Sequence, residues 1–221
     1  MGHVVAALDV GGTSIKSGVV RFARAADGAP GAPMAAIEVG PSLPTLAQAD
    51  AESILARLAE MADHALALDG GATGLAIAIC GPFDLDAGES RMRGVHKFED
   101  IFGVDLRTEL RARSTIGDRP IRFARDAESA GTGEALIGAG AGFDRVVTIT
   151  LGTGMGTCLT DHARPVEYVD GFGVEHTAMR VTADLTMREE AYGARWLVPA
   201  AGPITAEQHA KLAGQALGRR G

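Results

Sequence analysis

Two glycine-rich segments contain residues that could hold phosphate groups. They read Asp9-Val10-Gly11-Gly12-Thr13-Ser14-Ile15-Lys16 and Leu151-Gly152-Thr153-Gly154-Met155-Gly156. Glycine lets backbone N–H groups approach an anion with no Cβ in the way, and the hydroxyls of Thr and Ser add further donors. Asp9, at the carboxyl end of an apolar run, could hold a hydrated Mg²⁺ beside those phosphates.

The first segment alone is equally well explained as an ordinary hairpin turn whose glycines only supply a positive φ angle. The second segment has the spacing G-x-G-x-G and leads into a strand, so it is not the dinucleotide fingerprint. Neither segment ends in the Gly-Lys-Ser/Thr of a Walker A loop. Two such turns, one in each half of the chain, predict that both bind the same polyphosphate, from opposite sides.

Strands are the elements that must position these turns. The apolar run His3–Val10 and the run 15–22 predict a hairpin around the first turn, and the β-branched run 146–151 with 157–160 predicts another around the second. Strand, glycine turn and strand therefore occur twice without a close sequence repeat. The sequence predicts one domain over residues 1–117 and a second over 118–221.

The remaining elements follow from periodicity and capping residues. Apolar residues at helical spacing after Asp50 predict a helix that ends near Gly70, and Asp105 is the expected N-cap of a helix to Arg113. The sequence also predicts a loop at 23–33, strands at 34–39, 75–79 and 121–124, and helices at 127–139 and from 205 to about 217.

Four motifs, in order, resemble those of the ROK family (repressors, uncharacterised reading frames and sugar kinases) within the actin/hexokinase-like ATPase superfamily. The resemblance covers about residues 4–176. The first and last motifs are the two glycine segments. Between them lie Ala78-Ile79-Cys80-Gly81-Pro82-Phe83-Asp84, which is similar to a G-x-P-G-P-x-D loop, and Ala124-Arg125-Asp126-Ala127, which is similar to an Asn-Asp-Ala segment.

This resemblance implies an α/β, two-domain actin-like ATPase (ribonuclease H-like) fold with a shortened second domain. It implies a sugar kinase that transfers a phosphoryl group from ATP, or from polyphosphate, to a hexose hydroxyl with Mg²⁺. The implied cofactor-binding residues are Asp9, Gly11, Gly12, Thr13, Lys16, Gly152, Thr153 and Gly154, with Asp9 serving the metal. The implied substrate residues are Gly81, Asp84, Glu175 and His176.

Asp126 is the expected catalytic residue. It lies between a predicted strand and a predicted helix, where its carboxylate could accept the proton of a sugar hydroxyl that attacks a γ-phosphoryl group. The alternative is an ordinary N-cap of the helix that follows, and both roles can coexist.

The chain departs from the family pattern in several places. The zinc segment Cys-x-Cys-Gly-x-x-Gly-Cys is absent, since Cys80 and Cys158 are the only cysteines, so no structural zinc is expected. The chain has no Asn to contact the sugar. In the corresponding region His96 or Lys97 either binds a polar or anionic group or belongs to a solvated loop. The spacing between the Glu and His176 differs from the family pattern. His176 is therefore either a ligand-binding residue or a purely structural one.

Two overall hypotheses remain. The stretch after His176 is shorter than in relatives, so either the nucleotide is held mainly through its phosphates or turnover is lost. The alternative to a kinase is therefore a non-catalytic sugar- or nucleotide-binding ROK-like protein. A net charge of -7 without a basic block argues against nucleic acid as a partner. The apolar runs are too short for a membrane span, and the start lacks a signal peptide, so a cytoplasmic protein is expected, with homodimerisation left open.

Overall fold

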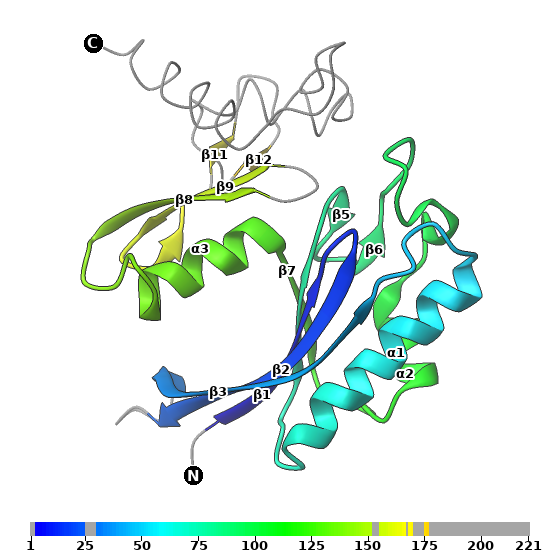
Figure 1. Cartoon of the computed structure of the whole chain (residues 1–221), viewed down its shortest axis with the longest axis horizontal. Helices are drawn as coiled ribbons and strands as arrows, with labels where there is room; N and C mark the ends of the chain where they lie inside the picture. The colour runs from blue at the N-terminus through cyan, green and yellow to red at the C-terminus, as the bar shows by residue number, and fades with distance from the viewer. Residues whose placement is uncertain (1–2, 25–29, 152–154, 167, 170–174, 177–221) are drawn as a thin grey trace. The chain divides into compact units, whose positions relative to one another are not determined.

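The computed structural model describes residues 3–24, 30–151, 155–166, 168–169 and 175–176 (Figure 1). The chain divides into two compact units, Met1–Asp126 and Ala127–Gly221. The domain boundary expected between residues 117 and 118 stays a prediction. No helix among the described residues is long and apolar enough to cross a membrane.

The first unit is built on a five-stranded sheet with the order β3-β2-β1-β4-β7. The strands are β1 (His3–Val10), β2 (Ser14–Arg24), β3 (Pro30–Pro44), β4 (Leu75–Ile79) and β7 (Ile121–Arg125). Strands β1, β2 and β3 are antiparallel neighbours, whereas β4 and β7 run parallel to β1. The carboxyl ends of β1, β4 and β7 therefore meet at one edge of the sheet.

Two helices, α1 (Ala51–Leu68) and α2 (Leu106–Arg113), lie side by side on one face of this sheet (Figure 1). The buried apolar side chains of α1 recur at helical spacing, which is why one face of the helix packs on the sheet. They join strand residues such as Leu8, Ile77 and Ile121 in one continuous core.

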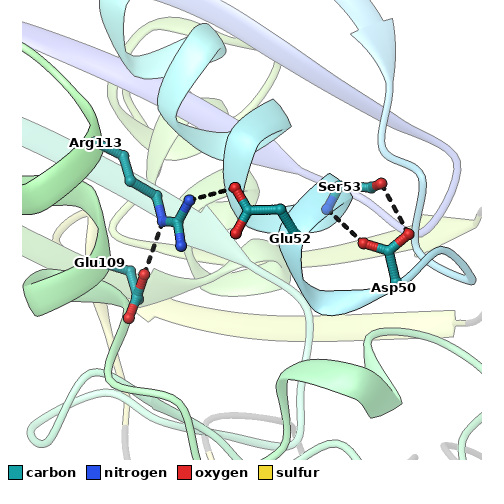
Figure 2. Close-up of polar contacts among 5 residues, drawn as sticks. All are labelled: Asp50, Glu52, Ser53, Glu109 and Arg113. Carbon is teal, nitrogen blue, oxygen red and sulfur yellow. Dashed lines mark hydrogen bonds and ion pairs between the residues drawn. The ribbon is translucent and has the colours of Figure 1, made fainter.

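The helices begin and pair through local polar contacts (Figure 2). The Asp50 carboxylate accepts a hydrogen bond from the Ser53 backbone N–H at 2.9 Å, which caps α1, and Asp105 caps α2 in the same way. Arg113 on α2 forms ion pairs with Glu109 on the same helix at 2.8 Å and with Glu52 on α1 at 2.6 Å. This arginine therefore links the first turn of α1 to the last turn of α2.

Short elements connect β4 to α2. A small hairpin is formed by β5 (Phe83–Asp84) and β6 (Glu89–Ser90), and a single 3₁₀ turn, η1 (Glu99–Ile101), follows. Between them the loop 91–98 is anchored by Phe98, whose side chain is fully buried.

The second unit contains a three-stranded sheet with the order β10-β9-β8. Its strands are β8 (Arg145–Leu151), β9 (Met155–Asp161) and β10 (Arg164–Pro165); β11 (Tyr168–Val169) and β12 (Glu175–His176) form a separate pair. Helix α3 (Asp126–Ile137) packs closely on this sheet, since a Cβ added to Gly131 would lie 2.6 Å from the Cβ of Cys158. The predicted pairing of the strands on either side of each glycine segment is confirmed by β1–β2 and β8–β9, while residues 152–154 of the second segment lie outside the described residues.

The observed elements differ from the predicted ones mainly in their ends. Strand β3 begins at Pro30 and runs to Pro44, so the predicted loop is shorter and the predicted strand longer. Helix α1 ends at Leu68 with Asp69 as its C-cap, ahead of Gly70. Helix α3 begins at Asp126 itself. The helix expected from residue 205 lies outside the described residues.

Candidate active site

The first glycine turn is held by contacts within the first unit. It joins β1 to β2, and its Gly11 backbone N–H donates to the Ser14 carbonyl at 3.0 Å. Thr45, fully buried after β3, donates its hydroxyl to the Gly11 carbonyl at 2.8 Å and its backbone N–H to the Thr13 carbonyl at 3.0 Å. The turn is thus fixed from both sides, which pre-forms its backbone for a ligand.

Asp9 and Lys16 face each other across the β1–β2 ladder. The Lys16 ammonium lies 3.1 Å from a carboxylate oxygen of Asp9, and the two side chains are 62% and 49% exposed. An exposed pair of this kind contributes little to stability because water screens it. Both groups can therefore turn to a bound metal ion or phosphate at little cost.

Asp126 directly follows β7 and is exposed at the carboxyl edge of the first sheet. Because α3 begins at this residue, Asp126 is the first helical residue and not the residue before the helix, as the N-cap alternative had placed it. The neighbouring β4 ends at Ile79 and is followed by Cys80, whose backbone N–H donates to the Val10 carbonyl at 3.4 Å. The first glycine turn, Cys80 and Asp126 therefore share one sheet edge.

The pKa of the Cys80 thiol is changed by burial and by nearby charges at this edge. This thiol is only 6% exposed, and burial is the main reason why its pKa is raised; the nearby Asp126 carboxylate raises it further. The Lys97 ammonium acts in the opposite direction, through its charge and through a hydrogen bond with the thiol. Lys97 is half-buried whereas His96 is exposed, and for both residues the choice between binding a polar or anionic group and belonging to a solvated loop stays open.

The predicted substrate residues Gly81 and Asp84 occupy the connection from β4 into β5. An Asp84 carboxylate oxygen accepts a hydrogen bond from the Ala87 backbone N–H at 2.9 Å, and Arg91 lies 3.7 Å from the other oxygen. The Ala87 hydrogen bond is the main reason why the Asp84 pKa is lowered, and Arg91 adds to it. Asp84 therefore shapes the β5–β6 turn, and its contact with substrate stays a prediction.

The remaining predicted site residues belong to the second unit. Glu175 and His176 form β12, in register with Val169 and Tyr168 of β11. Gly152, Thr153 and Gly154 lie outside the described residues. Within the part of the chain that is described, no group of three or more His, Cys, Asp or Glu side chains could hold a metal ion.

Sequence reasoning missed two contributors to this edge. Thr45 holds the first turn in place, but its partners Gly11 and Thr13 are more than 30 residues away in the sequence, so no local pattern marks it. Cys80 belonged to a recognised motif, yet its closeness to Asp126 follows only from the parallel pairing of β4 with β7, which places the residues after Ile79 and Arg125 side by side.

Comparisons with known proteins identify this arrangement. The ROK family profile matches residues 5–180. The glucokinase of Thermotoga maritima is 30% identical over 131 residues, 59% of this chain and 39% of that protein. A ROK family glucokinase from Streptomyces griseus, solved with glucose and AMPPNP, matches with a TM-score of 0.52 at 24% identity. The match covers 74% of this chain and 46% of the glucokinase chain. The ROK hexokinase of Thermus thermophilus has a TM-score of 0.53 at 22% identity, with coverages of 97% and 72%.

The chain belongs to the ROK family. Its fold is the α/β actin-like ATPase fold of that family. The chain spans less than half the length of the two glucokinases that it matches.

Proposed function

We propose that the protein is a sugar kinase that transfers the γ-phosphoryl group of ATP to a hydroxyl of a hexose or hexose derivative. The observation that carries the proposal is the shared sheet edge of the first unit. There the pre-formed turn after β1 and the exposed carboxylate after β7 are separated only by β4. Family membership and kinase relatives support the same reaction class.

Asp126 is the proposed general base. Its carboxylate accepts the proton of the acceptor hydroxyl, the hydroxyl oxygen forms a bond to the γ-phosphorus, and the bond to the ADP oxygen breaks. The residue suits this task because it is exposed at the sheet edge yet fixed at the junction of β7 with α3.

The residues of the first turn fit a nucleotide phosphate with Mg²⁺. Gly12 has no Cβ to keep an anion away from the backbone of the turn that the Gly11 hydrogen bonds fix, and the half-exposed Asp9 offers carboxylate oxygens, which Mg²⁺ prefers. Bound Mg²⁺ would neutralise charge on the phosphates. Lys16 and Thr13 would add a cation and a hydroxyl to the same ligand, and Gly152, Thr153 and Gly154 are proposed to serve it from the second glycine segment.

Replacement of Asp126 by Asn tests the proposal. Asn preserves the size of the side chain but cannot accept the proton, so phosphoryl transfer should fall by about 10²–10⁴-fold. Sugar and nucleotide affinities should change little. A coupled assay with a panel of hexoses gives the rates, and calorimetry gives the affinities.

The matched control is Asp118→Asn, because Asp118 is an exposed carboxylate between α2 and β7. It should retain the wild-type rate. An active wild type with an equally active Asp126→Asn variant would exclude the role of Asp126. A wild type that binds sugar but phosphorylates none of the hexoses would contradict the kinase proposal and favour a non-catalytic binding protein.

A further inference from the structure

Thr45 contacts the first glycine turn from outside the β1–β2 hairpin, and its side chain is fully buried. Its hydroxyl donates a hydrogen bond to the Gly11 carbonyl at 2.8 Å, and its backbone N–H donates to the Thr13 carbonyl at 3.0 Å. A buried hydroxyl without a partner is costly, so the bond to Gly11 is strongly favoured over its absence. The Thr45 side chain therefore fixes the direction of the Gly11 carbonyl.

This carbonyl also decides where the next backbone donor points. The Gly11 carbonyl and the Gly12 N–H belong to one peptide unit, which is trans. The two groups of a planar trans peptide point in opposite directions. Because the carbonyl faces the buried Thr45, the Gly12 N–H faces away from the core. Among the residues that the structure describes, none accepts a hydrogen bond from this N–H, so the donor is available to a ligand.

The segment that carries Thr45 is itself held in place. Leu46, the next residue, has a φ angle of 58°, which non-glycine residues rarely adopt and which tertiary contacts must stabilise. One such contact is the hydrogen bond from the Phe98 backbone N–H to the Ala47 carbonyl at 2.6 Å, next to the fully buried Phe98 side chain. The Thr45 hydroxyl is therefore presented to the turn by a fixed backbone.

We propose that Thr45 is a positioning residue that aims the Gly12 N–H at a phosphate oxygen of the donor nucleotide. The inference rests on the proposed function, since that function brings the nucleotide phosphates to the first glycine turn. Thr45 acts only through Gly12, because its own side chain is fully buried. A backbone N–H gives a phosphate a charge-assisted hydrogen bond, so loss of the Thr45 hydroxyl weakens the binding of phosphate and not of the acceptor.

Calorimetry on the full chain tests this role with Mg²⁺–AMPPNP and Mg²⁺–tripolyphosphate, which share a phosphate chain and differ in the nucleoside. Thr45→Val removes the hydroxyl but keeps the shape of the side chain and the backbone bond to Thr13. Both ligands should bind to this variant about 10- to 100-fold more weakly, because a hydrogen bond to a charged group is worth that much. Thr45→Ala, a second variant without the hydroxyl, should weaken both ligands likewise.

Thr45→Ser separates positioning from packing. It keeps the hydroxyl and loses the buried methyl group, so it should retain most of the wild-type affinity, whereas a merely structural role would make it no better than Thr45→Val. The matched control is Thr73→Val, because the Thr73 hydroxyl donates to the Val4 carbonyl at 3.0 Å, near the opposite end of β1. This control should bind both ligands as the wild type does.

Circular dichroism and thermal melting confirm that each variant folds. Wild-type affinity in a folded Thr45→Val or Thr45→Ala variant overturns the inference. So does an equal loss in Thr45→Ser or in Thr73→Val, and so does a wild type that binds neither ligand.

Kinetics of the same variants separate this inference from the kinase proposal. Thr45→Val should raise the KM for ATP and leave the KM for the hexose unchanged. Hexose phosphorylation with an unchanged KM for ATP in Thr45→Val would overturn the role of Thr45 and leave the kinase proposal standing. Hydroxyl-dependent binding of Mg²⁺–AMPPNP by a chain that phosphorylates no hexose would do the reverse.

Discussion

At the scale of single residues, Asp50 shows how one side chain sets the start of a helix. Its carboxylate accepts hydrogen bonds from the backbone N–H and the hydroxyl of Ser53 at 2.9 and 3.0 Å. These bonds, the backbone one first, hold the pKa of Asp50 below its ordinary value of 3.8. A lowered pKa in the folded state stabilises the protein above the unfolded-state pKa, and this contribution is lost as the pH falls through the folded-state pKa.

We therefore expect Asp50→Ala to lower the melting temperature at pH 7, and the deficit to shrink as the pH falls towards about 2, because a growing fraction of the wild-type carboxylate is then protonated. Asp50→Asn should keep most of the cap, because Asn is a comparable N-cap residue, and should show less dependence on pH. Thermal melts of the three proteins across this range provide the measurement. A deficit of Asp50→Ala that is the same at both pH values would contradict the expectation.

The same scale shows which site residues could be found from sequence. Asp9, Gly11 and Asp126 each lie at the end of a β-favouring run, so local pattern alone placed them at strand ends. Lys97 was only one of two options in a loop, because no periodic pattern in the 91–98 segment shows which of its side chains is buried, whereas the structure leaves His96 exposed and Lys97 half-buried. Contacts made through the core have no sequence period to reveal them.

At the scale of elements, α3 depends on a glycine in its interior. Gly131 is buried, and a Cβ there would lie 2.6 Å from the Cβ and 2.7 Å from the Sγ of Cys158. Gly131→Ala should push α3 from the β8–β9 sheet and cost about 1–3 kcal/mol, as overpacking does. Gly133 in the same helix would meet nothing within 4 Å, so Gly133→Ala should gain about 0.5–1 kcal/mol through helix propensity.

Urea unfolding of both variants measures the difference in the free energy of unfolding. Equal effects of the two substitutions would show that the close approach of α3 to β9 does not decide the stability of this unit. The pair is informative because the helix, the residue type and the added methyl group are the same.

The ends of helices and strands were predicted correctly where a single sequence signal, such as an apolar run or an N-cap residue, marked them. The limits of β4 and the start of α2 at Asp105 agree with the structure, because an apolar run and an N-cap mark them. The predicted strand 34–39 is shorter than β3, since the Ala, Gly and Pro content of residues 23–33 indicated a loop, whereas β3 contains Pro30, Pro33, Pro41 and Pro44. These prolines are tolerated because β3 is at the edge of the sheet, where a missing N–H interrupts fewer ladder bonds.

At the scale of the whole molecule, an antiparallel pair of neighbouring strands occurs once in each unit. The chain uses the same device in both units, β1–β2 in the first and β8–β9 in the second. The ROK fold could be inferred from sequence because its motifs are short and lie at strand ends. The identity of the bound sugar could not, because sugar specificity depends on side chains from several loops whose spatial grouping the sequence does not encode locally.

A ligand that binds the folded chain must also stabilise the whole molecule. If the first glycine turn holds nucleotide phosphates, Mg²⁺–ATP at about 100 times its Kd should add about 2.7 kcal/mol, which corresponds to a rise in melting temperature of about 5–10 °C for a chain of this size. Gly12→Val should abolish this rise, because a β-branched side chain blocks the backbone of the turn. Gly70→Val is the control, since Gly70 is exposed after α1 and a Cβ there meets nothing within 4 Å. Thermal scans with ATP, with polyphosphate and with neither distinguish the two donors, and a rise that persists in Gly12→Val would show that the turn does not bind phosphate.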